Sequence, residues 1–309
     1  MPAHGPEKSL LSIAKRHMAT DFELEVVLDA RHARIGESVL SEAHALLESI
    51  EESLSEYRES SLVYRLNHSR AGEWIPLDVS FSEILELSRG YFQETGGAFS
   101  PFARSPFSAS FDDLEIDRAA KRIRRKRGDL FVGFGAVGKG YALYRVAGLL
   151  DRQGFTDYRL SAGGSSWVFR GFQADDRPWE IAWAWSQDAD GDWQGQAYVL
   201  PRGRPVAIGV SGTAEKGQHF LWQGAPLRTK IQSAFCSAGS AAEADAISTA
   251  LLVGASREGE KFLTNFPNRG IHIRCLAYVD LENQLIYNQT FDTLFLREGR
   301  KPNDPTTEK

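Results

Sequence analysis

Apolar residues recur at intervals of three and four positions in several parts of the chain, which is the spacing of one face of an α-helix. Residues 37–52 place Leu40, Ala43, Leu47 and Ile50 in this way. The same spacing predicts helices over residues 80–97, 139–153, 242–253 and about 256–266. Short amphipathic helices are therefore expected along most of the chain.

Capping residues mark the ends of two of these helices. Ser80 and Glu83 have the spacing of a capping box, which predicts where the helix over 80–97 begins. Gly154 follows the helix over 139–153, and glycine at such a position commonly ends a helix.

Segments rich in β-branched and aromatic residues predict strands. FELEVVLDA (22–30) alternates in part between apolar and polar positions. Further along the chain the same reasoning predicts the strands YRLSA, SSWVFRG, WEIAWAW, QAYVL, RPVAIGVS, HFLW and SAFCSA, followed by a hairpin of RCLAYVD and QLIYNQT. Because these strands often follow one another directly, the pattern favours an α+β fold with mixed or antiparallel sheets and packed helices.

The ends of the chain lack this patterning. Residues 1–16 and 298–309 are polar and aperiodic, so we expect them to be mobile, and residues 17–297 are expected to form one two-lobed unit. The net charge of −5 and the apolar fraction of 42% are those of an ordinary globular protein. No stretch approaches the roughly 20 apolar residues of a membrane span, and no leader is evident, so a cytoplasmic protein is expected.

Residues 118–127 contain seven basic side chains in ten positions. Such a run can bind nucleic acid, but the alternation around Ile123 favours an exposed strand or hairpin with a solvated face. We therefore expect no nucleic-acid partner. The tryptophans of WEIAWAW, at positions 179, 183 and 185, are expected to cover one face of a sheet.

A glycine-rich segment, Gly133 to Gly140 (GFGAVGKG), fits two nucleotide-binding patterns at once. It matches G-x-G-x-x-G of dinucleotide-binding folds, and it matches G-x-x-x-x-G-K of phosphate-binding loops except that Gly140 replaces the hydroxyl residue that would bind the metal. The basic chain before it does not look like a buried parallel strand, which counts against both. A strand-to-helix turn without a ligand is a third possibility. In every case Lys139 and the free N–H groups of a helix start could approach a pyrophosphate.

Asp245 and Thr249 are four residues apart in AEADAISTAL, so they share one face of a predicted helix made of small and apolar residues. A carboxylate and a hydroxyl are oxygen ligands of the kind that Mg²⁺ prefers. The alternative is that Asp245 only interacts with the helix dipole and that Thr249 bonds back to the helix. The spacing leaves both open.

Taken in order along the chain, seven segments together resemble the ApbE family, the FAD:protein FMN transferases, over roughly residues 18 to 290. They are Met18-Ala19-Thr20, LSEYRESSLVYRLN (54–67), TGGAFSPF (95–102), GFGAVGKGYALY (133–144), SAGGSSWVFRG (161–171), VSGTAEKGQHFLW (210–222) and AEADAISTAL (242–251).

The resemblance implies an enzyme that binds FAD with Mg²⁺ and passes the FMN half to a Thr or Ser hydroxyl of a flavoprotein acceptor, releasing AMP. It implies that Asp245, Thr249 and the carbonyl of Gly138 are metal ligands, that Lys139 neutralises phosphate charge, and that His219 is the base. The implied cofactor contacts are Met18, Tyr57, Ser61, Gly97, Gly135, Gly138, Lys139, Gly163 and Ser211.

Four acidic positions of the family pattern are absent. They are replaced by Ser100, Gly133, Tyr144 and Trp222. Acids near a metal help to orient its ligands, so their loss leaves two alternatives to transfer: an FAD-binding protein without transferase activity, or an FAD pyrophosphatase.

Overall fold

The computed structural model describes residues 8–106, 108–187, 193–199, 205–213, 220–222, 224–266, 275–288 and 296–297. The helices are α1 (Ala33–Leu54), α2 (Leu62–His68), α3 (Val79–Glu94), α4 (Gly138–Arg152), α5 (Ala241–Glu258) and α6 (Glu260–Asn265). The strands are β1 (Lys8–His17), β2 (Thr20–Asp29), β3 (Ile75–Pro76), β4 (Leu114–Asp117), β5 (Arg122–Arg125), β6 (Tyr158–Ala162), β7 (Ser166–Arg170), β8 (Glu180–Gln187), β9 (Trp193–Val199), β10 (Val206–Gly212), β11 (Leu221–Trp222), β12 (Ala225–Pro226), β13 (Ile231–Ala238), β14 (Cys275–Asp280), β15 (Leu285–Tyr287) and β16 (Leu296–Arg297).

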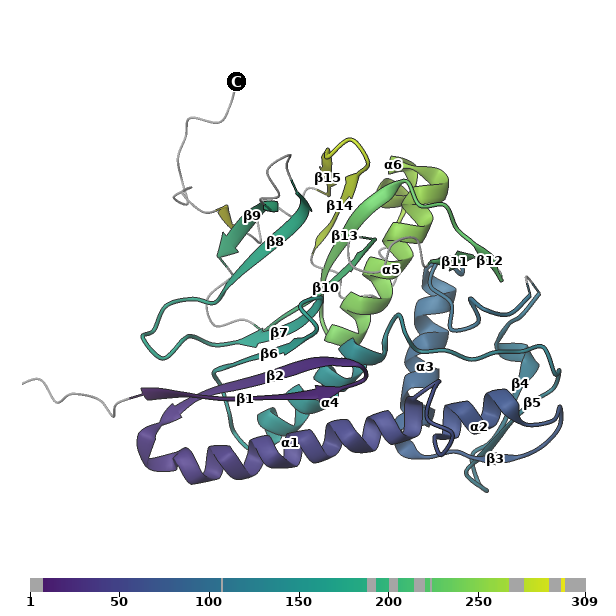
Figure 1. The fold of residues 1–309 in the computed structure, drawn as a ribbon, viewed down its shortest axis with the longest axis horizontal. Helices are drawn as coiled ribbons and strands as arrows, with labels where there is room; N and C mark the ends of the chain where they lie inside the picture. Colours follow the sequence, from purple (N-terminus) through teal and green to yellow (C-terminus); the bar gives the residue numbers. More distant parts are fainter. Residues whose placement is uncertain are drawn as a thin grey trace, which may run out of the picture.

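An eight-stranded sheet in the order β1-β2-β6-β7-β10-β13-β14-β15 forms the centre of the molecule (Figure 1). Every strand pairing among the described residues is antiparallel. Helices α1, α4 and α5 pack on this sheet, and the combination of helices with antiparallel sheets confirms the predicted α+β class. The predicted closing hairpin is also confirmed as β14 and β15.

Hydrophobic clusters cover both faces of the sheet, and among the described residues there are three, the third formed by α5 with β13 and β14. On one face, Phe22 and Leu24 of β2 are fully buried together with Leu40 and Leu47 of α1, in a core that also includes α4 and part of α5. On the other face, Trp183 of β8 packs against Phe235 of β13 with ring centroids 5.0 Å apart. Trp179 is buried in the same core, as predicted for this strand; the side chain of Trp185 lies outside what is described.

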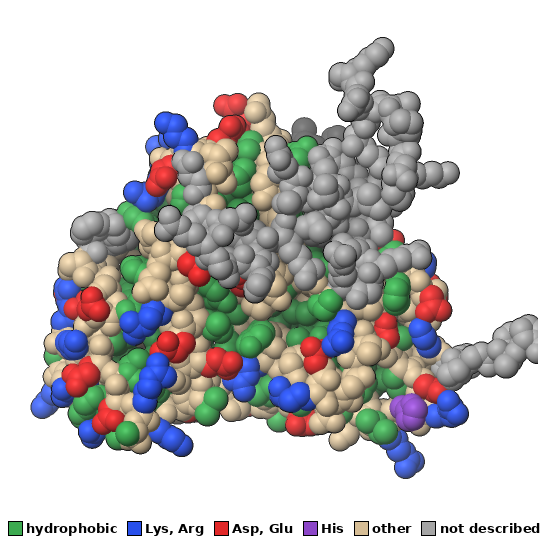
Figure 2. Space-filling model, turned by 180° about the vertical axis from the view of Figure 1, so that it is seen from behind, with side chains coloured by type: hydrophobic (Ala, Val, Ile, Leu, Met, Phe, Trp, Pro, Cys, Tyr) green, Lys and Arg blue, Asp and Glu red, His purple; other side chains and the backbone are tan. Residues whose placement is uncertain are grey.

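A smaller lobe contains α2, α3 and the three-stranded sheet β3-β5-β4 (Figure 1). The basic run of residues 118–127 includes β5, which pairs with β4, so the predicted exposed hairpin is confirmed. Its arginines pair with nearby acids, for example Arg122 with Asp117 and Arg124 with Glu115. On the face shown in Figure 2, basic and acidic side chains are interspersed.

The N-terminal strand corrects one expectation. Residues 8–16 belong to β1, which pairs with β2 along its whole length, whereas the sequence suggested a mobile segment over 1–16. Because β1 is an edge strand, Leu11 and Ile13 are only half-buried. Its exposed charged residues made the alternation of apolar and polar positions difficult to recognise in the sequence. Residues 1–7 and 298–309 lie outside the described part of the chain.

Two helix ends also differ from expectation. Asp78, not Ser80, caps α3, and its side chain accepts a hydrogen bond from the Phe81 N–H at 2.7 Å. Glu83 is therefore free to accept from the hydroxyl of Tyr141 at 2.8 Å, which ties α3 to α4. The two helices predicted over 242–266 are present as α5 and α6, separated at Gly259, where φ is +65°.

Among the helices of the described residues, none combines the length and the apolar character that a bilayer-spanning segment requires.

Candidate functional site

A pocket of about 980 Å³ lies where the smaller lobe meets the main sheet. Its walls come from the loop after α1, the end of α3 and the loop that follows, the start of α4, the β6–β7 turn, β10, β11, β13 and α5. Apolar surface from Phe92, Phe102 and Trp222 lies beside charged groups from Lys139 and Asp245. A large cavity with a few polar groups at one end is typical of a cofactor site.

Seven of the twelve predicted site residues line this pocket. They are Tyr57, Gly97, Gly135, Lys139, Ser211, Asp245 and Thr249. They come from distant parts of the chain, so the fold brings them together. His219 lies outside the described residues, and its role as a base stays a prediction.

Four other predicted residues do not line the pocket. Ser61 is fully buried and caps α2 by accepting from the Tyr64 N–H, and its assignment as a flavin contact stays a prediction. Met18, at φ +49°, is in the β1–β2 turn and packs on the main core. Gly138 begins α4, directly before Lys139. Gly163 lies in the β6–β7 turn, where a Cβ would come 2.3 Å from the Thr20 hydroxyl oxygen.

The carboxylate of Asp245 joins α5 to the start of α4. Its Oδ2 accepts a hydrogen bond from the Gly140 N–H at 2.7 Å, and the side chain is almost completely buried. Burial raises the pKa of Asp245 to about 6, against the opposing effects of the positive charge on Lys139 and the Gly140 hydrogen bond. The site therefore holds a carboxylate whose charge the protein only partly compensates.

Three hydroxyls of β10 and α5 lie close to one another. The Ser211 Oγ on β10 is 2.9 Å from the Ser248 Oγ and 3.0 Å from the Thr249 Oγ1, both on α5. Asp245 and Thr249 face the same pocket, as their spacing predicted. Carboxylate and hydroxyl oxygens together form a donor set suited to a hard divalent cation.

Gly140 has a structural reason to replace the hydroxyl residue of a phosphate-binding loop. A Cβ at this position would lie 2.1 Å from the carbonyl oxygen of Ala241 and 2.8 Å from the Cγ of Asp245. Residues 126–137 before the helix form turns and coil, not a strand, and no described strand pairing is parallel. The dinucleotide-fold and phosphate-loop interpretations of this segment are therefore wrong.

Substituting Gly140 is expected to damage the packing of α4 on α5. Gly140→Ala should lower the free energy of unfolding by about 3 kcal/mol, because the added methyl group meets backbone that cannot move independently. Gly148→Ala on the same helix is the control, since its Cβ would contact only the flexible end of Arg152 at 3.4 Å. Urea denaturation measures both. Equal stability of the two variants would contradict the close approach.

Neutralising Asp245 is expected to stabilise the ligand-free protein. The folded-state pKa of about 6 lies above the ordinary value of 3.8, so the folded state binds more protons between these values, and stability falls as the pH rises through that window. At pH 7 Asp245→Asn should thus raise the free energy of unfolding by up to about 3 kcal/mol, whereas near pH 4 the difference should disappear. Thermal denaturation across this range tests it, with the exposed Asp21→Asn as control. A pH-independent difference would contradict it.

Glu56 is a pocket residue that the sequence analysis missed. Its Oε1 accepts from the Phe134 N–H at 3.2 Å, and its Oε2 pairs with Arg104 Nη1 at 3.2 Å. A Cβ at Gly133 would lie 2.8 Å from Oε1 and 3.0 Å from Oε2 of Glu56. The Glu56 carboxylate thus fills the space that an acidic side chain at position 133 would occupy. Its position inside the segment LSEYRES was the available signal, but the pairing with Gly133 is not visible in one sequence.

The other three missing acids have no such replacement among the residues that line the pocket near them. Ser100 lines the pocket and accepts from the Phe102 N–H at 3.1 Å. Trp222 also lines the pocket, and the Arg257 guanidinium lies 4.1 Å from its ring centroid. Tyr144 is half-exposed on α4, away from the pocket wall.

The chain is similar to known proteins over most of its length. The family model of the ApbE family matches residues 18–273. The chain is 25% identical over 282 residues to FAD:protein FMN transferase of Salmonella typhimurium, with 79% of this chain and 78% of that protein covered. It is 23% identical over 244 residues to FAD:protein FMN transferase of Escherichia coli K12, covering 67% and 68%.

Solved structures share the fold. Flavin Transferase ApbE from Vibrio cholerae superposes with a TM-score of 0.75 at 17% identity, over 93% of this chain and 99% of that one. The ApbE protein of Thermotoga maritima gives the same TM-score at 21% identity, with the same coverage of both chains.

Proposed function

The chain belongs to the ApbE family, and from this premise we propose that it is a Mg²⁺-dependent FAD:protein FMN transferase. The observation that carries the proposal is that Lys139, Asp245 and Thr249 line one pocket together with the glycine-rich start of α4. The curated relatives it resembles are named for this activity. FAD is then the donor, and a flavoprotein with a Thr or Ser target is the acceptor.

The donor set fits Mg²⁺. Asp245 is a buried carboxylate with a raised pKa, which is the state expected of an anionic ligand without its cation. Thr249 and the Gly138 carbonyl would add neutral oxygen ligands. When bound, the ion would supply positive charge to the pyrophosphate.

The protein residues would bind and orient the donor. At the start of α4 the Val137 and Gly138 N–H groups donate to the Phe134 carbonyl and the Gly140 N–H donates to Asp245. The group there that would meet the pyrophosphate is therefore the positive charge of Lys139, which lines the pocket. Tyr57, which is 85% exposed, offers an aromatic face at the pocket for the flavin or adenine ring.

The proposed reaction is a displacement at phosphorus. The acceptor hydroxyl oxygen forms a bond to the phosphorus of the FMN half, and the pyrophosphate bond to the AMP half breaks. AMP leaves with the bonding electron pair on its phosphate oxygen. The hydroxyl proton passes to a base, and His219 is our proposed base because imidazole titrates near neutral pH.

Intact-mass spectrometry tests the proposal. The purified chain is mixed with FAD, Mg²⁺ and a small flavoprotein domain that carries the target threonine, and the same domain with that threonine changed to alanine is the control. We expect the acceptor to gain one FMN and AMP to appear in equal amount.

The absence of acids at Ser100, Tyr144 and Trp222 favours the second candidate, an FAD-binding protein without transfer. AMP release with unmodified acceptor would instead indicate FAD hydrolysis. A perturbed flavin spectrum with neither product would indicate binding alone. Either result would overturn transfer.

A further inference from the structure

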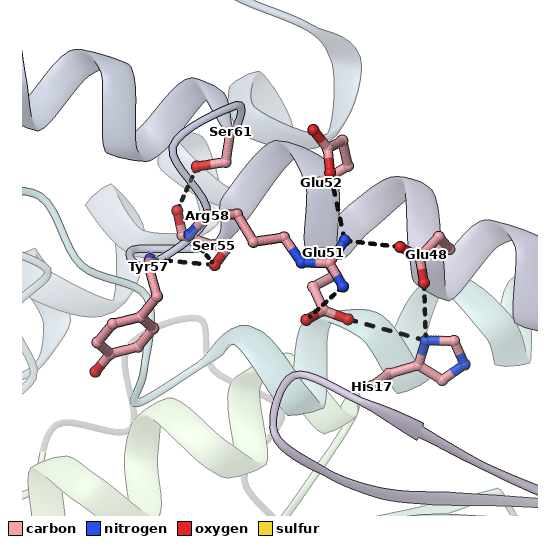
Figure 3. A network of polar contacts seen from close by, with 8 residues as sticks. All are labelled: His17, Glu48, Glu51, Glu52, Ser55, Tyr57, Arg58 and Ser61. Atoms are coloured by element: carbon pink, nitrogen blue, oxygen red, sulfur yellow. Dashed lines mark hydrogen bonds and ion pairs between the residues drawn. The ribbon is translucent and has the colours of Figure 1, made fainter.

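A second group of metal-ligand side chains lies outside the pocket. His17 is the last residue of β1, and Glu48 and Glu51 lie on α1. Because the two glutamates are three residues apart, they share one helix face, and Figure 3 shows both of them directed toward the imidazole of His17. None of the three residues lines the pocket.

The distances within this group suit a shared ion better than direct bonds. The His17 Nδ1 is 3.7 Å from the Glu48 Oε2 and 4.0 Å from the Glu51 Oε2. Both distances are too long for hydrogen bonds. All three ligand atoms lie within 4.8 Å of one another. Two ligands of one tetrahedral Zn²⁺ are about 3.4 Å apart, so small side-chain rotations would complete the site.

The orientation of His17 is fixed by a second histidine. His17 is 6% exposed, and its Nε2 lies 3.1 Å from the Nδ1 of the buried His44. Its Nδ1 has no hydrogen-bond partner in the described part of the chain, although it is buried and faces two carboxylates. Burial lowers the pKa of His17 in spite of these carboxylates. A histidine ligand is commonly held in this way through its other ring nitrogen.

Arg58 contacts only one carboxylate oxygen of Glu48 and one of Glu51, which leaves the other oxygen of each available as a metal ligand. Its Nη1 is 2.7 Å from the Glu48 Oε1, and its Nη2 is 3.0 Å from the Glu51 Oε1, so each carboxylate keeps Oε2 directed at His17 (Figure 3). Glu52 also contacts Arg58. Three carboxylates thus surround one guanidinium, and the other cation acting on His17 is the exposed Lys15. The excess negative charge favours a cation.

We propose that His17, Glu48 and Glu51 bind a divalent transition-metal ion of the Zn²⁺ type at a structural site separate from the pocket. One imidazole nitrogen and two carboxylate oxygens match Zn²⁺, whereas Mg²⁺ prefers oxygen ligands alone. Glu48 is 56% exposed, which leaves an open side for a water ligand.

The ion would hold the loop after α1 in place. Arg58 lies in this loop directly after Glu56 and Tyr57, both of which line the pocket. The Tyr57 and Arg58 N–H groups donate to the Ser55 hydroxyl at 3.2 and 3.1 Å. Fixing the two carboxylates would therefore fix Arg58 and with it the loop that carries two pocket residues.

Calorimetric titration with ZnCl₂ tests this site on the full chain. Asp245→Asn is used as the common background, so that the pocket carboxylate does not contribute. We expect one Zn²⁺ per chain, binding at least about tenfold more weakly after His17→Gln or Glu51→Gln. His32→Gln is the matched control, because His32 is exposed at the start of α1. Its affinity should not change.

Two further measurements distinguish loss of the metal site from misfolding of the variants. Zn²⁺ should raise the melting temperature of the background protein but not that of the Glu51→Gln variant, whose amide can still accept from Arg58. Co²⁺ should give a visible absorption band that depends on His17. Unchanged Zn²⁺ affinity in both the His17→Gln and Glu51→Gln variants would overturn the proposal, as would a melting-temperature rise that persists in them.

Discussion

Asp245→Asn is expected to lower the rate of FMN transfer by about a thousandfold, which corresponds to about 4 kcal/mol of lost transition-state stabilisation. The substitution removes the one charged ligand of the proposed Mg²⁺ site but keeps the shape of the side chain. Its amide oxygen can still accept from the Gly140 N–H, so the contact between α4 and α5 should persist. The loss is therefore expected to come from charge and not from packing.

The measurement is a single-turnover time course of acceptor labelling by intact mass at saturating FAD. The same variant is expected to be more stable than the native chain at pH 7, so poor folding cannot explain lost transfer. Asp21→Asn, an exposed site on β2, should transfer at the native rate. Native-rate transfer by Asp245→Asn would rule out this carboxylate as a metal ligand.

Glu56→Ala is expected to slow transfer by roughly 10- to 100-fold, a range typical for loss of a side chain that orients a metal or phosphate site. Glu56 contacts the Phe134 N–H in the glycine-rich segment and the Arg104 side chain, which also lines the pocket. Without its carboxylate, the Phe134 N–H loses its partner and Arg104 loses its counter-charge. Arg104 lines the pocket and Phe134 lies between the lining residues Gly133 and Gly135, so both losses would disturb the pocket wall.

Moving this carboxylate to position 133 gives a sharper test. Gly133→Asp alone should be inactive or unstable, because its Cβ would lie 2.8 Å from the Glu56 Oε1 and would place two carboxylates in one space. The double variant Glu56→Ala/Gly133→Asp should recover most of the native rate. Double-mutant-cycle analysis of the four proteins measures the coupling. Additive losses, with no recovery in the double variant, would show that the two positions do not share a role.

Local features of this protein could be predicted from its sequence. Helix α1 follows from the spacing of Leu40, Leu47 and Ile50, and α4 follows from a similar face and from Gly154 at its end. Asp245 and Thr249 line the same pocket. This could be predicted because residues four apart on a helix lie on one face, whatever the rest of the fold is.

Features that depend on distant residues could not be predicted. Nothing near Gly133 in the sequence indicates that Glu56 fills its side-chain space, and nothing near Gly140 indicates that a backbone carbonyl of α5 lies against it. Strand β1 was missed because an edge strand needs little apolar surface. Ser61 lies in a segment that could be recognised in the sequence. Its role as the N-cap of α2 became clear only from the position at which that helix begins.

The way the pocket is divided along the chain has a consequence for biosynthesis. In sequence order, the first pocket residues lie in the loop after α1 and the last lie in α5. Helix α5 follows β13 and precedes β14 along the chain. During synthesis the ribosome therefore releases most of the protein before the complete pocket can exist. If FAD binds this pocket as proposed, it cannot select correctly folded early intermediates, and it can stabilise only nearly finished chains. Flavin shortage would then affect the lifetime of the mature protein and not the yield of nascent chains.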